Sequence, residues 1–191
     1  MLKKIVITSA ALALTGCMEG KPSVSKICES TPSICSDLNT DNWCNVERSE
    51  LIYSRYERSL NDTSENQYFV MRDLEKYSKC IELAATLEMT KSKQKQSDRL
   101  EAFINSRKNI EKLADETADS EHPLWLYWHW ANRSDHEALD KLLALEGSKK
   151  METPELKLAL ATYYTKKDSE KTFELLYSAL RLYRPDDKVN P

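Results

Sequence analysis

A regular spacing of apolar residues by four and three positions runs through the middle of this chain and most constrains its fold. Between Ser64 and Leu87 this spacing connects a set of apolar positions: Val70, Leu74, Tyr77, Ile81 and Ala84. It places them on one face of an α-helix, whereas a strand would alternate every second residue. Only 3 Gly occur in 191 residues, which leaves few of the turns that a sheet protein needs. The chain is therefore predicted to be all-α.

The N-terminus carries the pattern of an exported bacterial lipoprotein. Lys3 and Lys4 precede an apolar stretch, Ile5–Leu14, which is too short to span a bilayer but has the length of a signal-peptide core. The sequence Leu14-Thr15-Gly16-Cys17 ends this stretch and resembles the lipobox of bacterial lipoproteins, in which the cysteine is acylated and the chain is cut before it. We expect residues 1–16 to be a signal peptide and Cys17 to carry the lipid. An ordinary signal peptide followed by a coincidental cysteine is the alternative.

The residue after Cys17 bears on which membrane holds the anchor. Two or three acyl chains hold a protein stably, at about 0.8 kcal/mol per buried CH₂ group. In Gram-negative lipoproteins an Asp at that position favours the inner membrane, and this chain has Met18. We therefore expect an anchor in the outer membrane, with the protein facing the periplasm.

The charge of the mature chain argues against one class of partner. Cleavage before Cys17 removes Lys3, Lys4 and no acid, so the net charge changes from −3 to −5. An acidic chain repels nucleic-acid phosphates and anionic lipid headgroups. We expect no nucleic-acid partner, and an association with the membrane that depends on the N-terminal lipid.

The mature part has the length of one domain. Residues 17–26 are polar and contain Gly20 and Pro22, as in a short tether. Residues 27–185 are interpreted as a single all-helical domain that begins with an irregular, disulfide-stapled segment, Ile27–Asn45. We expect Pro185 to end the last helix and residues 186–191 to form a tail.

Apolar spacing and capping residues set the expected helix boundaries. The first two helices are predicted over Val46–Leu60 and Ser64–Leu87, and the third has its apolar face at Leu100, Phe103, Ile110 and Leu113. The fourth is expected to begin with a Ser120 cap and Pro123 in its first turn. The fifth runs from the capping box Ser134/Glu137 to Gly147. The last two helices are expected to start at Thr153 and at Asp168 or Ser169.

Four cysteines remain once Cys17 is lipidated, and an even number in an oxidising periplasm implies two disulfides. Cys44 and Cys80 each lie eighteen residues from Asp62, in the turn between the first two helices. In an antiparallel hairpin, equal distances from the turn place residues side by side. The pairing Cys44–Cys80 is therefore predicted, with Cys28–Cys35 by elimination. A metal site is the alternative, although these spacings are not those of zinc ligands.

The C-terminal half contains a repeated pattern. A shift of 33 residues superposes Asp135 on Asp168, Leu142 on Leu175 and Trp130 on Tyr163. This period is close to the 34 residues of the tetratricopeptide repeat, and the second unit matches its spacing at Leu160, Ala161, Tyr164, Tyr177 and Pro185. Phe173 stands where that repeat has a small residue. Residues 121–185 are therefore interpreted as repeat-like helix pairs.

The segment Leu124–Trp130 holds the candidate binding residues Trp125, Trp128 and Trp130. Not all three rings can be inside, because they point all round a helix. Trp128, with Leu124 and Ala131, is expected in the core. A second tryptophan either packs on a neighbouring helix or contacts a partner or membrane surface.

No motif points to catalysis. The histidines His122, His129 and His136 are spaced by seven, but a new helix starting at Ser134 separates the last of them, so no metal site is expected. The chain contains no Gly-x-Ser-x-Gly, Gly-rich phosphate loop or His-Glu-x-x-His. We expect no catalytic residue, no cofactor and no enzymatic activity.

The lipobox, the four cysteines and two further stretches carry a family resemblance. These stretches are Leu145-Glu146-Gly147 and the segment Glu155–Thr165. Together they are similar to a family of uncharacterised Gram-negative lipoproteins, the domain of unknown function 2989. The resemblance implies lipidation and brings no substrate, activity or catalytic residue with it.

Three functional hypotheses follow. The first is a lipid-anchored helical module that binds a protein partner at the periplasmic face of the outer membrane. The second is an envelope factor that binds a small ligand or a cell-wall fragment through the Trp-rich helix. The third is a hydrolase with an unrecognised site.

Overall fold

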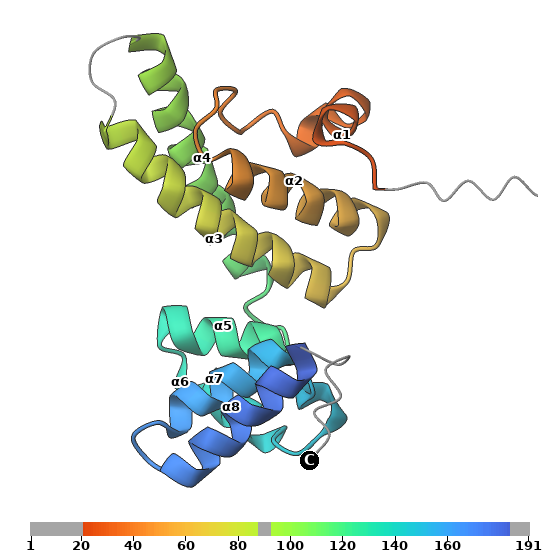
Figure 1. Ribbon diagram of the computed structural model, residues 1–191, viewed down its shortest axis with the longest axis vertical. Helices are drawn as coiled ribbons and strands as arrows, with labels where there is room; N and C mark the ends of the chain where they lie inside the picture. Colours follow the sequence, from red (N-terminus) through yellow and green to blue (C-terminus); the bar gives the residue numbers. More distant parts are fainter. Residues whose placement is uncertain (1–20, 88–92, 184–191) are drawn as a thin grey trace, which may run out of the picture.

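The computed structural model describes residues 21–87 and 93–183, and every regular element in these two segments is helical. The elements are α1 (Val24–Ser30), η1 (Pro32–Ile34), α2 (Asn45–Leu60), α3 (Ser64–Leu87), α4 (Lys93–Glu116), α5 (Pro123–Arg133), α6 (His136–Ala144), η2 (Lys149–Met151), α7 (Pro154–Tyr164) and α8 (Ser169–Tyr183). Figure 1 shows one group made of α1 to α4 and another made of α5 to α8. The all-α prediction is confirmed. The segment predicted to be a signal peptide, Cys17, and the predicted helix stop at Pro185 with the tail after it lie outside the described residues.

The central helix of the first group is α3, which packs against both α2 and α4 (Figure 1). The five apolar positions that predicted this helix are all buried. Its bounds agree with the prediction, and α2 begins one residue earlier than predicted. The Thr63 hydroxyl accepts a hydrogen bond from the Asn66 N–H at 3.1 Å, which fixes the start of α3.

The apolar face predicted for α4 is wrong at one position. Leu100 is 50% exposed, whereas Arg99 and Ser106 are buried. The Ser106 hydroxyl donates to the Ser78 hydroxyl of α3 at 2.9 Å, and Arg99 forms an ion pair with Asp41. Polar side chains with partners far away in the sequence therefore occupy part of the inner face of α4.

The segment before α2 is more regular than predicted. Ser23 caps α1 by accepting a hydrogen bond from the Lys26 N–H, so Val24–Lys26 is helical rather than part of a tether. Ile27 is buried, and α1 packs against both η1 and α2. A helix of seven residues is not stable in isolation, so α1 depends on the contact that buried Ile27 makes with the core.

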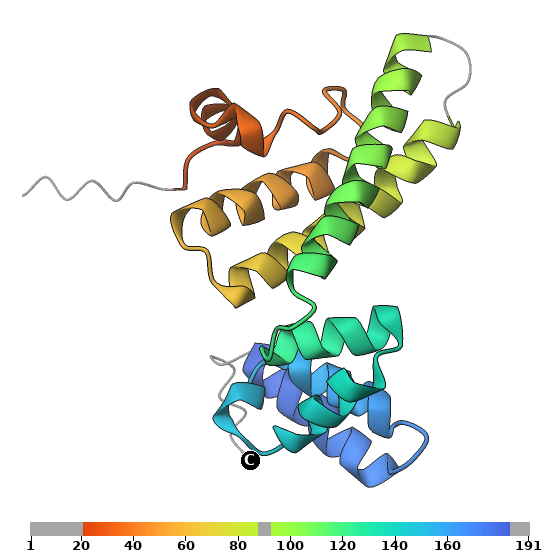
Figure 2. The same ribbon diagram turned by 180° about the vertical axis from the view of Figure 1, so that it is seen from behind.

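In the second group, α5 packs against α6 and α7, and α7 packs against α8 (Figure 2). Two predicted caps are wrong by one or two residues. His122, not Ser120, is the N-cap of α5, because Pro123 at the first helical position keeps the preceding residue extended. Ser134 adopts a left-handed conformation that ends α5, and Asp135 caps α6 by accepting from the Ala138 N–H.

The remaining boundaries in this group agree more closely with the sequence. Thr153 caps α7, and Asp168 accepts a hydrogen bond from the Lys171 N–H at the start of α8. Gly147 has the expected positive φ of 83°, but α6 ends at Ala144, before it. Judged by length and apolarity, none of the helices in the described segments could cross a membrane.

Candidate functional site

The aromatic run of α5 is divided between the core and the surface. Trp125 is completely buried and Trp128 nearly so, whereas Ala131, expected in the core, is exposed. The Trp125 indole N–H donates to the Ser64 carbonyl at 3.0 Å, and the Trp128 indole N–H donates to Glu75 Oε1 at 2.9 Å. Both rings therefore join α5 to α3. For Trp125 and Trp128 the structure shows a packing role instead of a binding surface.

Glu75 gives this junction a pH dependence. Burial raises its pKa, and the Trp128 hydrogen bond and nearby Lys79 and Arg107 offset that rise only in part. A carboxyl with a raised folded-state pKa stabilises the fold while protonated, and that contribution is lost as the pH rises through the folded pKa. We expect Glu75→Gln, whose amide oxygen can still accept from Trp128, to gain more stability over the parent at neutral than at acidic pH. Urea unfolding at both pH values measures this difference, and a pH-independent difference would contradict the assignment.

The third tryptophan belongs to a row of half-buried rings that connects α5 with α7. We use the name aromatic row for Tyr127, Trp130, Tyr163 and Tyr164. Successive ring centroids are 6.1, 6.0 and 4.9 Å apart. The Lys167 ammonium lies 3.8 Å from the centre of the Tyr163 ring. Each ring keeps part of its surface in contact with solvent. Of the three candidate binding tryptophans, only Trp130 is partly exposed and so could contact a partner.

A hydrogen bond to Glu146 holds one end of the aromatic row, at Tyr164. The Tyr164 hydroxyl donates to Glu146 at 2.7 Å, and this bond, together with burial, raises the pKa of Tyr164 to about 12. The Glu146 carboxylate also forms an ion pair with Lys171 of α8, with Nζ 3.2 Å from Oε1. Glu146 therefore connects Tyr164, at one end of the aromatic row, to Lys171 of α8.

The three histidines lie in different environments. His129 is buried, with Nε2 3.0 Å from the Thr117 carbonyl oxygen. His122 occupies the N-cap position of α5 without a side-chain capping hydrogen bond, and burial lowers its pKa. His136 is exposed at the start of α6. Within the described residues, the histidines contribute to no group that could hold a metal ion.

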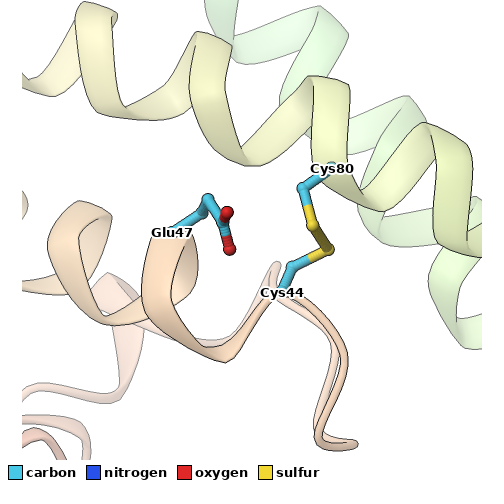
Figure 3. Close-up of side chains that lie close together, drawn as sticks. All are labelled: Cys44, Glu47 and Cys80. Carbon is cyan, nitrogen blue, oxygen red and sulfur yellow. A yellow bond between two sulfur atoms is a disulfide. The ribbon is translucent and has the colours of Figure 1, made fainter.

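Both predicted disulfides are present. They join Cys28 to Cys35 and Cys44 to Cys80, with Cα atoms 5.6 and 5.8 Å apart. Cys44, Glu47 and Cys80 place possible metal-ligand atoms within 4.8 Å of one another (Figure 3). A metal ion would require thiolates, whereas these two sulfur atoms are bonded to each other. The group therefore connects the start of α2 to α3.

A buried polar network lies beside the Cys44–Cys80 disulfide, and no pattern in the sequence predicted it. Asn39 Oδ1 accepts from the Tyr77 hydroxyl at 2.8 Å, and Asn39 Nδ2 donates to Asp41 at 2.6 Å. Asp41 also pairs with buried Arg99 at 2.6 Å. Burial acts to raise the pKa of Asp41, but the hydrogen bonds from Arg99, Asn39 and the Trp43 N–H outweigh it and lower that pKa. The network fastens the segment before α2 onto α3 and α4.

A cavity of about 580 Å³ between α2, α3 and α7 is lined by Tyr53, Ser54, Phe69, Arg72 and Glu155, among others. Its charged groups are largely paired: Lys21 lies 3.1 Å from Glu57, and Arg72 lies 2.9 Å from Asp73. The Ser54 hydroxyl donates to Asp73, a carboxylate that Arg72 and Lys76 also contact. These contacts hold α2 to α3.

Comparisons with known proteins agree with the resemblance found in the sequence. The model of a family described as "Protein of unknown function (DUF2989)" matches residues 14–191. Neither a curated protein nor a solved structure matches the chain. The match covers both helix groups and all four disulfide-bonded cysteines, and the chain belongs to the DUF2989 family.

Proposed function

We propose that this protein is a non-enzymatic, lipid-anchored envelope protein that binds a protein partner through the aromatic row. The observation that carries the proposal is the partly exposed set of rings on α5 and α7, centred on Trp130 and Tyr163. Large rings with few rotatable bonds give much contact area at a small loss of conformational entropy. Aromatic residues also dominate the binding energy of many interfaces.

The internal correspondence supports a repeat-like arrangement of helix pairs. Asp135 and Asp168, 33 residues apart, each accept from the N–H three residues later, at 3.0 and 2.9 Å. Leu142 and Leu175, at the same spacing, are both buried. Trp130 and Tyr163 share this spacing and contact each other, so equivalent positions of two units form one surface. Tetratricopeptide-like pairs that stack in this way provide extended binding surfaces.

The charge beside the row indicates what a partner segment would carry. Lys167 lies over Tyr163, and its neighbour Lys166 is exposed. A segment with an apolar side chain against Trp130 and a carboxylate near Lys167 would satisfy both features. The charge-assisted contact would set the register of the segment along the row.

The proposed anchor is close to the fold. Three residues separate Cys17 from Lys21, and an extended chain reaches at most about 3.5 Å per residue, or roughly 14 Å here. Lys21 already pairs with Glu57 of α2. An acylated Cys17 in the outer membrane would hold the α1–α4 group near the bilayer. The aromatic row belongs to the other group (Figure 1).

Capture of the partner tests the proposal. Trp130→Ala and Tyr163→Ala, made separately in the tagged full-length protein, are expected to reduce recovery of a crosslinked partner by about tenfold or more, as for interface hot spots. Leu60→Ala removes a side chain that is 65% exposed at the end of α2 and serves as the matched control. Equal recovery from all three variants would exclude the row as the binding surface.

A second candidate is binding of a small ligand or cell-wall fragment, now centred on Trp130. The partial exposure of this ring favours it, since the two other tryptophans of α5 are internal. Murein fragments would then quench tryptophan fluorescence in the parent and not in Trp130→Phe. A flat titration of the parent would exclude this candidate.

A further inference from the structure

The last helix carries an apolar face on its outer side. Phe173, Tyr177 and Leu180 are 71, 62 and 62% exposed, and Leu176 lies beside them. Their spacing of four and three places them in one stripe along α8. The opposite side of the helix is already used, because Leu175 and Ala179 are buried in the group formed with α7. Thus α8 is apolar on two sides, and one of them has no partner among the described residues.

The eight residues printed after α8 are mostly polar and are poorly suited to cover this stripe. The eight residues after Tyr183 include two Pro, two Asp, one Lys and one Arg, and Val189 is their single aliphatic side chain. Terminal helices of stacked helix pairs normally present a polar outer face to remain soluble. The stripe on α8 lacks this polarity and instead has the composition of an interface.

The charges beside the stripe indicate which partner fits. Glu174 lies in the first half of α8 and Arg181 in the second, seven residues apart and so on one face. Glu174 is 71% exposed, with a weak contact to Lys171 at 3.7 Å. A hollow of about 440 Å³ separates Glu174 from Arg181 and leaves room for incoming side chains. A helix that approaches this face therefore needs a basic group opposite Glu174 and an acidic group opposite Arg181.

We propose that the partner is a second copy of this chain, with the two α8 helices packed antiparallel about a two-fold axis at Tyr177. In that arrangement Phe173 meets Leu180 of the second copy, and Tyr177 meets its own equivalent. Glu174 meets Arg181 of the second copy on the same side of the pair, and the reciprocal contact repeats it. One patch thus satisfies both its apolar and its charged requirements, as a two-fold interface demands.

The size of the face sets the strength of the dimer. The 15 residues of α8 extend over roughly 22 Å. A stable interface buries about 800 Å² of accessible surface on each partner, and two helices of this length bury less than that. The pair is therefore a weak dimer, favoured where the chain is concentrated. It leaves the aromatic row of α5 and α7 free, and is independent of the function proposed above.

Crosslinking through the proposed axis tests the dimer in cells that express the full-length protein. Tyr177→Cys with a short bismaleimide should give a covalent dimer of this chain, measured against the parent and against Lys166→Cys at an exposed site before α8. Adding Glu174→Arg should lower the dimer yield by about tenfold, because like charges then face each other. Adding Arg181→Glu to that variant should restore it.

Each other outcome overturns the proposal. No dimer from Tyr177→Cys, an equal yield from Lys166→Cys, or a yield unaffected by charge reversal would exclude the two-fold pair. A covalent adduct with a different protein would show that the stripe serves another partner. Restoration by the double reversal keeps the test independent of folding, since that variant contains both substitutions.

Discussion

Replacing Trp125 with Ala is expected to lower the free energy of unfolding by about 3–5 kcal/mol, the range for a buried aromatic side chain. The ring is completely enclosed, contacts Tyr68 and Trp128, and donates to the Ser64 carbonyl. Its loss would leave a cavity between α3 and α5, where the two helix groups meet. Trp130→Ala, in the same helix, is expected to cost about 1 kcal/mol, because that ring is partly in solvent already.

Urea unfolding followed by far-ultraviolet circular dichroism measures both variants. Loss of the junction should also broaden or split the transition of Trp125→Ala, since the α5–α8 group would unfold more independently. Trp125→Phe keeps an aromatic ring and removes the N–H, and should cost about 1 kcal/mol through loss of the hydrogen bond to the Ser64 carbonyl. Equal losses for Trp125→Ala and Trp130→Ala would contradict the different roles assigned to these rings.

Arg99→Met is expected to cost about 3 kcal/mol, the lower end of the range for a broken buried ion pair, because it would leave the Asp41 carboxylate, which is 15% exposed, without its cation. The methionine side chain can fill most of the space, so the loss would report on charge rather than on a cavity. Adding Asp41→Asn should recover part of the stability, since no uncompensated charge then remains. If the double variant were no more stable than the single one, the ion pair would not be the source of the loss.

The effect of Arg99 should depend on pH. The pKa of Asp41 is lowered in the folded state, so its contribution to stability is present at neutral pH and is lost as the pH falls through that folded pKa. The gap between Arg99→Met and the parent should therefore narrow on acidification. Chemical denaturation at a series of pH values measures the gap, and a constant gap would contradict the proposed role of Asp41.

The sequence predicted those parts of the fold that depend on local spacing. The five apolar positions of α3 identified its buried face, and Thr63 marked its start. The disulfide pairing followed from the equal distance of Cys44 and Cys80 from the turn. Each of these features depends on residues that are close together in the chain or that lie at equal distances from the turn between α2 and α3.

Features that depend on distant partners could not be read in this way. Arg99 occupies the inner face of α4 because Asp41 meets it from 58 positions earlier, and Leu100 is displaced outward. Trp125 and Trp128 are internal because Ser64 and Glu75 accept their N–H groups. Helical spacing assigned the aromatic residues to α5, but it could not show which rings α3 would cover. The 33-residue shift made Trp130 and Tyr163 equivalent positions of two units, but it could not show that their rings contact each other or that they stay partly exposed.

Site-specific photo-crosslinking from the aromatic row tests the central claim most directly. A photoreactive phenylalanine analogue replaces Tyr163 in the full-length protein and in its Cys17→Ser variant. The same analogue at position 60, in place of Leu60, serves as the control. We expect the Cys17→Ser protein to fractionate with the soluble periplasm, and position 163 of the anchored form to label one abundant protein that position 60 does not. Membrane fractionation of Cys17→Ser, or identical labelling from positions 163 and 60, would contradict a lipid-anchored protein that binds its partner through the aromatic row.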